Sequence, residues 1–283
     1  MNNSKYFDQV GQITAWNPGG LPVGSRRAFL RTAAALTAMI PEVALAAKLA
    51  AAPGPATIWW RSDDVGVDTL QFVRLLALAQ RRQAPVALAV VPANLKASCT
   101  ARILNCPQAT VVQHGIAHAN NAASGKQIEL GGRIDRKLLA ERLKWGRERL
   151  SSAFGGRFLP MQAPPWNRID PDVTSMLPSL GFSSLSTCGR EPAAEAAPGL
   201  RQINIHLDLY HWFEPRGALT YEQAVSQLTT LVRAANGRPV GLLTHHSVMN
   251  EEAFVTLERL LTYVQQQKNM RLVGIGDLVG KVR

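Results

Sequence analysis

Short β-rich runs alternate with amphipathic helical stretches along most of this chain, and this alternation limits the fold more than any other feature. Eight runs occur, at residues 56–62, 85–91, 109–113, 157–163, 182–186, 200–206, 239–244 and 271–275. The first helical stretch, 68–82, begins at the N-cap candidate Asp68. Such alternation is typical of parallel strands joined by helices. The sequence predicts an α/β fold, a distorted TIM-like (β/α) barrel of seven or eight strands.

The N-terminal part has a different character. Ser25-Arg26-Arg27 precedes Phe29-Leu30 and an Ala-rich apolar stretch, a pattern that resembles a twin-arginine export signal. Small residues at 44–46 suit signal peptidase. The alternative is a basic amphipathic helix of the mature protein. The apolar run is too short to predict a stable membrane span.

The domain boundaries follow from this pattern. We expect a signal peptide over residues 1–46, a linker over 47–55 and one catalytic domain over 56–283. The resemblance implies that the twin-arginine machinery exports the folded protein, with any cofactor already inserted. The expected location is therefore periplasmic or secreted.

Charge and cysteine content exclude some classes of protein. The formal net charge is +11, but there is no arginine-rich block, zinc-finger spacing or aromatic–basic interleaving, so nucleic-acid binding is not expected. The charge favours anionic surroundings or reflects a diffusely basic surface. An odd cysteine count without C-x-x-C argues against a thiolate metal site. Cys99 and Cys106 could pair in an oxidising compartment, and Cys188 is expected to be a free thiol.

Polar residues of catalytic type gather where predicted strands end. The five clusters are SDDVG (62–66), QHGIAH (113–118), APPWN (163–167), HLDLYHW (206–212) and LTHHS (243–247). In a parallel barrel the carboxyl ends of all strands form one face, and sites are built there. We therefore expect the five clusters to share one site.

Two histidines and a carboxylate from these clusters suit a metal ion. His114 and His118 are four residues apart, and on a helical turn this spacing puts both imidazoles on one side. With Asp64 they would leave open positions for water and substrate. The neighbouring Asp63 could then stay free as a base. Zinc is the expected divalent ion, although Co²⁺, Ni²⁺ or Mn²⁺ could serve; loop histidines without a metal are the alternative.

These residues, in this order, resemble the polysaccharide deacetylases, the NodB-homology proteins of carbohydrate esterase family 4, over roughly residues 56–277. The family pattern T-F-D-D-G reads RSDDVG here, H-(S/T)-x-x-H reads HGIAH, R-x-P-(Y/W)-G reads APPWN and L-x-H reads LTH, while D-x-x-D-W is loosely matched by LDLYHW. The resemblance implies a deacetylase barrel with Asp63 as catalytic base and His245 as acid. It also implies Asp64, His114 and His118 as metal ligands, and Pro165, Trp166, Asp208 and Trp212 around the sugar.

The departures indicate a divergent branch. The arginine that orients the base in the family is Ala163 here, and the candidates to replace it are Arg168, Arg61 and Arg133. Gly115 stands where the family has a hydroxyl residue.

The predicted function is metal-dependent removal of N- or O-linked acetyl groups from a carbohydrate, with amino-sugar N-deacetylation in the cell envelope as the leading reaction. A non-catalytic glycan-binding protein is one alternative, since Ala163 lacks the family's guanidinium. Hydrolysis of another C–N bond, as in a deformylase, is a second. Two histidines and a carboxylate also hold iron in non-haem oxygenases, which usually have a β-rich fold.

Overall fold

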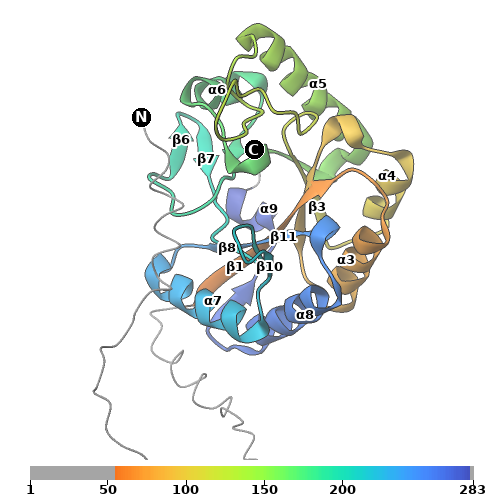
Figure 1. Ribbon diagram of the computed structural model, residues 1–283, viewed down its shortest axis with the longest axis vertical. Coiled ribbons are helices and arrows are strands. Elements are labelled where there is room, and N and C mark those ends of the chain that lie inside the picture. The colour runs from red at the N-terminus through yellow and green to blue at the C-terminus, as the bar shows by residue number, and fades with distance from the viewer. Residues whose placement is uncertain (1–54, 281–283) are drawn as a thin grey trace, which may run out of the picture. The chain divides into compact units, whose positions relative to one another are not determined.

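Strands and helices alternate along residues 55–280, the part of the chain that this computed structural model describes (Figure 1). The predicted signal peptide and nearly all of the predicted linker lie outside the described residues. The elements are β1 (Ala56–Val65), α3 (Leu70–Arg81), β2 (Val86–Val90), α4 (Ala97–Leu104), β3 (Ala109–Gln113), α5 (Arg136–Phe154), β4 (Phe158–Gln162), α6 (Pro171–Met176), β5 (Ser184–Leu185), β6 (Glu195–Ala197), β7 (Leu200–Gln202), β8 (Leu207–Asp208), β9 (Tyr210–His211), β10 (Gly217–Ala218), α7 (Tyr221–Ala235), β11 (Val240–His245), α8 (Glu251–Gln266), β12 (Met270–Leu272) and α9 (Ile275–Val279).

Most strands join one curled sheet, in the order β6-β7-β5-β4-β3-β2-β1-β11-β8. The central neighbours pair in parallel, whereas β6 adds an antiparallel edge and β12 pairs with β1. Parallel strands need crossover connections, and helices α3, α4, α5, α7 and α8 surround the sheet (Figure 1). Each of the eight predicted runs overlaps a strand, so the predicted distorted (β/α) barrel is confirmed.

One extended segment, residues 200–209, connects the two ends of the sheet. Its first part, β7, pairs with β5, and the N–H of Ile205 still donates to the carbonyl of Thr187 on that side, at 3.0 Å. At the next residue the partner changes, because the N–H of His206 donates to the carbonyl of Gly241 on β11, at 2.7 Å. The segment continues as β8 along β11. The switch closes the sheet around its interior.

The interior of the curled sheet is packed with aliphatic and small side chains around Trp59. The buried members of this cluster are Trp59, Ala87, Ala89, Val112, Met161, Ala163, Ile203, Ile205, Leu243, Val273 and Ile275. Leu278 and Val279 of α9 pack against the cluster together with Leu159, which lies at the amino end of β4. Helix α9 therefore covers the amino end of the barrel and leaves the carboxyl end for the site.

Four of the surrounding helices, α3, α5, α7 and α8, begin at a polar side-chain cap, and one predicted cap is wrong. Thr69, not Asp68, caps α3: its hydroxyl accepts the N–H of Phe72, at 3.1 Å. The carboxylate of Asp68 instead forms an ion pair with Arg102 on α4, at 2.6 Å. A hydroxyl and a carboxylate are both good N-caps, so the sequence alone did not separate the two neighbours.

The cysteines take no part in cross-links. Cys99 and Cys106 are buried free thiols, and Cys188 is half-buried and free. The Cys99–Cys106 pairing that the sequence allowed is therefore absent. Within residues 55–280, no helix has the length and apolar character that crossing a bilayer requires.

Candidate metal centre

A β-bulge near the end of β1 separates the two adjacent aspartates. Successive strand residues point to opposite faces, so Arg61 and Asp63 share the inward face with Trp59. The pairing of β1 with β2 then shifts register between Ser62 and Val65. Asp64, within this shift, has a φ of 64°. Because of the bulge, the Asp64 side chain no longer follows the alternation of side chains between the two faces of β1. The neighbouring carboxylates of Asp63 and Asp64 therefore reach different partners.

Asp64 meets the two histidines of the HGIAH turn. Its Oδ1 lies 3.3 Å from His114 Nε2 and 3.2 Å from His118 Nε2. The three groups offer ligand atoms that all lie within 4.8 Å of one another. His114 is buried and His118 and Asp64 are partly exposed. The expected convergence of one carboxylate and two imidazoles is present, and it opens toward solvent.

A hydrogen bond fixes which nitrogen of His114 faces Asp64. The Nδ1 of His114 lies 2.8 Å from the carbonyl oxygen of Ala163, and a carbonyl can only accept, so Nδ1 carries the proton. In the neutral ring Nε2 is then the lone-pair nitrogen, as a metal ligand requires. Ala163, where the family has its arginine, thus contributes through its backbone.

The electrostatics of the cluster suit a cation. Burial opposes ionisation of Asp64, but the interactions of its carboxylate with His114 and His118 outweigh burial and hold the pKa of Asp64 below its usual range. Burial lowers the pKa of His118, but the Asp64 carboxylate outweighs burial and raises it. The ionised Asp64 carboxylate therefore favours the positive form of His118, and a divalent ion could take the place of that proton. Two nitrogens and one oxygen with open positions are the ligands of a hydrolytic zinc site.

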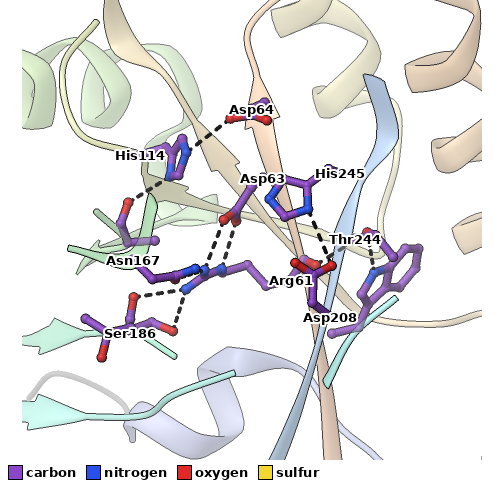
Figure 2. Close-up of polar contacts among 12 residues, drawn as sticks. Arg61, Asp63, Asp64, His114, Asn167, Ser186, Asp208, Thr244 and His245 are labelled. Atoms are coloured by element: carbon purple, nitrogen blue, oxygen red, sulfur yellow. Dashed lines mark hydrogen bonds and ion pairs between the residues drawn. The ribbon is translucent and has the colours of Figure 1, made fainter. Parts of the chain in front are cut away.

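Arg61 holds Asp63 inside the barrel (Figure 2). Its Nε lies 2.8 Å from Asp63 Oδ1, and its Nη2 donates to Asp63 Oδ2 at 3.0 Å. The remaining donors reach the carbonyl and hydroxyl of Ser186, at 2.9 and 2.8 Å, and Asn167 Oδ1, at 2.6 Å. The guanidinium is fully buried. A buried guanidinium that contacts both carboxylate oxygens fixes the direction of the Asp63 carboxylate.

The other two arginine candidates do not reach Asp63. Arg168 donates to the carbonyl of Gln127, at 2.8 Å, and Arg133 is exposed. Of the three candidates, Arg61 alone contacts Asp63.

A second carboxylate–histidine pair lies at the end of β11 (Figure 2). His245 Nδ1 is 3.6 Å from Asp208 Oδ1, and the Nε1–H of Trp212 donates to Asp208 Oδ2 at 2.8 Å. The ring of Trp212 stands edge-on to His245, with centroids 4.8 Å apart. Burial lowers the pKa of His245, but the Asp208 carboxylate outweighs burial and raises it. His246 faces away and packs on Phe72 of α3.

The APPWN turn lies beside the candidate metal ligands. Trp166 meets His118 edge-on, with centroids 4.4 Å apart, and Pro165 is buried beneath the turn. Four of the six non-glycine residues with positive φ in the described part of the chain belong to this region: Asp64, His118, Trp166 and Asn167. Such backbone is uncommon and gathers at functional sites.

Sequence reasoning missed several residues that build the site. Ser186 and Asn167 complete the shell of Arg61. Ser186 ends the predicted run 182–186 and Asn167 ends the APPWN cluster after the run 157–163, so their position at carboxyl ends of strands was a usable signal. Glu129 accepts hydrogen bonds from the HGIAH turn, but it lies in a loop remote from any predicted strand, and no sequence pattern marked it.

No protein-family model matches this sequence, and no curated protein matches it. Solved structures do. A protein assigned as a polysaccharide deacetylase from Mycobacterium smegmatis is 15% identical, with a TM-score of 0.62, over 80% of this chain and 90% of that chain. A peptidoglycan deacetylase from Bacillus subtilis is 13% identical, with a TM-score of 0.52 over the same shares. This chain has the polysaccharide deacetylase fold. A family 4 carbohydrate esterase from Bacillus anthracis also shares this deacetylase fold, at 14% identity and a TM-score of 0.50, over 87% of this chain and 94% of that chain.

Proposed function

We propose that this protein is a metal-dependent hydrolase that removes acetyl groups from a carbohydrate. The observation that carries the proposal is the arrangement of three units at one end of a deacetylase barrel. These are the Asp64–His114–His118 cluster, the Arg61–Asp63 pair and the Asp208–His245 pair. A cation site with a carboxylate and a histidine beside it is what hydrolysis of an amide or ester needs.

Asp64, His114 and His118 would hold the metal ion, and their donor set fits zinc. When bound, the ion supplies a Lewis acid that polarises the acetyl carbonyl and lowers the pKa of water. Asp63 accepts the proton of the attacking water. Arg61 holds the Asp63 carboxylate in a fixed direction.

His245 then donates a proton to the leaving amine or hydroxyl, because an amine anion is a very poor leaving group. Its partner Asp208 favours the protonated imidazole, which is the form that a general acid needs before the bond breaks. Trp212 fixes Asp208 and covers His245, and Trp166 offers an aromatic ring beside His118. Acetate and a free amine or hydroxyl are the products.

The leading substrate class is an N-acetylated amino sugar of the cell envelope. The similar structure from Bacillus subtilis is that of a peptidoglycan deacetylase, which supports this choice. The presence of Arg61 beside Asp63 weakens the main argument for a non-catalytic glycan-binding protein, since the guanidinium missing at Ala163 has a replacement.

We further propose export by the twin-arginine pathway, which the Arg26-Arg27 sequence supports. Cell fractionation of an Arg26→Lys/Arg27→Lys variant tests this proposal, and unchanged export would contradict it.

The test of the function is acetate release. The protein is incubated with N-acetylated amino-sugar oligosaccharides and, separately, with O-acetylated oligosaccharides, with and without a chelator. We expect release from the N-acetylated set, its loss on chelation and recovery with Zn²⁺, and none from His114→Ala. Full activity in a metal-free preparation would contradict the mechanism. Binding of sugar without acetate release would favour the glycan-binding alternative.

A further inference from the structure

Glu129 is a buried carboxylate that accepts three backbone hydrogen bonds from the metal-ligand turn. Its side chain is 2% exposed. Oε2 accepts the N–H of Ile116, at 3.0 Å, and Oε1 accepts those of Ala117 and Ala119, at 2.8 and 3.1 Å. The last two donors flank His118. Three N–H groups converging on one carboxylate fix the backbone that carries the second imidazole.

The sequence of the turn leaves room for this carboxylate. Gly115 has a φ of 58°, and a Cβ added there would lie 1.8 Å from Glu129 Oε2. Any side chain at position 115 would therefore displace the carboxylate. The residue that follows His114 has to be glycine here, and this explains why the hydroxyl residue of the deacetylase pattern is missing. The absence of a side chain at Gly115 and the position of the Glu129 carboxylate therefore depend on each other.

The loop between the turn and Glu129 holds the carboxylate in place. Asn120 Oδ1 accepts the N–H groups of Ala122 and Ile128, at 3.0 and 3.1 Å. The Nδ2 of Asn121 donates to the carbonyl of Glu129 itself, at 2.6 Å. The loop thus folds back, and Glu129 lies against the 115–119 turn.

The three backbone N–H groups compensate the charge of Glu129. Among residues 55–280, no cationic side chain forms an ion pair with it. A buried carboxylate is costly unless it is hydrogen-bonded, so the three N–H groups are needed to hold it. Two of the three donors, the N–H groups of Ala117 and Ala119, flank His118, so the Glu129 carboxylate places negative charge close to a candidate metal ligand.

We propose that Glu129 is a positioning residue for the metal centre, which holds the 115–119 turn so that His118 faces Asp64 and adds negative charge behind the cation. This inference rests on the proposed metal site and adds a residue to it. Groups that orient metal ligands typically contribute about 10- to 100-fold to metal affinity.

The experiment compares the full-length protein with Glu129→Gln, which keeps the volume and removes the charge. The matched control is Glu191→Gln, which removes another carboxylate that accepts a backbone N–H, from Asn204 at 2.8 Å, outside the metal centre. Zinc affinity is measured by competition with a chromophoric chelator, and the Co²⁺ absorption spectrum reports the ligand geometry. We expect about 10- to 100-fold weaker zinc binding and an altered cobalt spectrum for Glu129→Gln, and wild-type values for Glu191→Gln.

The outcomes separate this inference from the proposed function. Wild-type protein that binds no zinc would contradict the metal site itself. Wild-type binding together with equal affinity in a folded Glu129→Gln variant would overturn the role of Glu129 alone. If Glu129→Gln does not fold, Glu129→Asp replaces it, because aspartate keeps the charge on a shorter side chain. Its zinc affinity is expected to lie between that of the wild type and the value, about 10- to 100-fold weaker, expected for Glu129→Gln. Wild-type zinc affinity in Glu129→Asp, or unfolding of both variants that zinc does not reverse, would also overturn the inference.

Discussion

At the scale of single residues, the centre depends on charges that are buried in pairs. Arg61 and Asp63 lie two residues apart on β1 and share its inward face. Removing one member of a buried pair leaves the other charge uncompensated, which is far more costly than the pair itself. The site's chemistry and the barrel's stability therefore depend on the same side chains.

Replacing Arg61 with alanine should unfold the protein more easily and remove activity together. We expect a loss of about 3–5 kcal/mol in the free energy of unfolding, because Asp63 would remain buried without its cation. Urea denaturation measures this loss. Arg61→Lys keeps a charge but not the fork that reaches Asp63, Ser186 and Asn167, so it should recover part of the stability and little of kcat. Wild-type stability in Arg61→Ala would contradict the pairing.

Replacing Asp208 with asparagine should change the pH dependence of catalysis. The Asp208 carboxylate raises the pKa of His245, so the protonated acid persists to higher pH in the wild type. Activity is expected to fall as pH rises through that pKa, since the deprotonated imidazole cannot donate. Without the carboxylate, the fall in kcat/KM should occur at lower pH. A pH–rate profile whose alkaline limb stays in place would show that His245 is not the titrating acid.

At the scale of elements, periodicity predicted the barrel and local geometry defined the site. Alternating strands and amphipathic helices could be read from apolar spacing, and the polar clusters at strand ends could be read as one face. The bulge at Asp64 could not, because a register shift depends on pairing with β2 rather than on the residues 62–65 themselves. The change of partner at His206 also lies beyond local pattern, since it depends on where β5 and β11 end.

The β9–β10 hairpin is an element whose role can be separated from the fold. It forms its own two-stranded sheet and carries Trp212 to His245 and Asp208. Replacing residues 212–216 with a short Gly-Ser turn should leave the melting temperature nearly unchanged, because the main sheet is untouched. The expected loss in kcat is about 10- to 100-fold, part of what a well-placed general acid contributes. Calorimetry and acetate release measure the two effects, and a large drop in melting temperature would show that the hairpin supports the barrel.

At the scale of the whole molecule, one end of the barrel is closed by α9 and the other carries the chemistry. The proposed metal ligands come from β1 and from the turn after β3, and the proposed acid comes from β11. An ion that binds Asp64, His114 and His118 together would bind only the folded chain. Metal binding and global stability should therefore be linked.

Adding zinc to metal-free protein should raise its melting temperature in a concentration-dependent way. At a free zinc concentration of 100 times Kd, the expected stabilisation is about 2.7 kcal/mol. Thermal denaturation with buffered zinc and with chelator measures it. The control is His118→Ala, which lacks one ligand and should respond much less. An equal response in both proteins would place the zinc elsewhere.

The location of Arg61 on the same strand as Asp63 has a consequence for how this barrel could diversify. A proton acceptor whose counter-ion comes from a distant turn is misaligned whenever that turn is remodelled. Here both groups belong to one rigid stretch of backbone, so their mutual geometry survives changes in the connections above it. Insertions and exchanges around Trp166 or the β9–β10 hairpin should therefore alter which sugar is accepted well before they alter how the bond is cut.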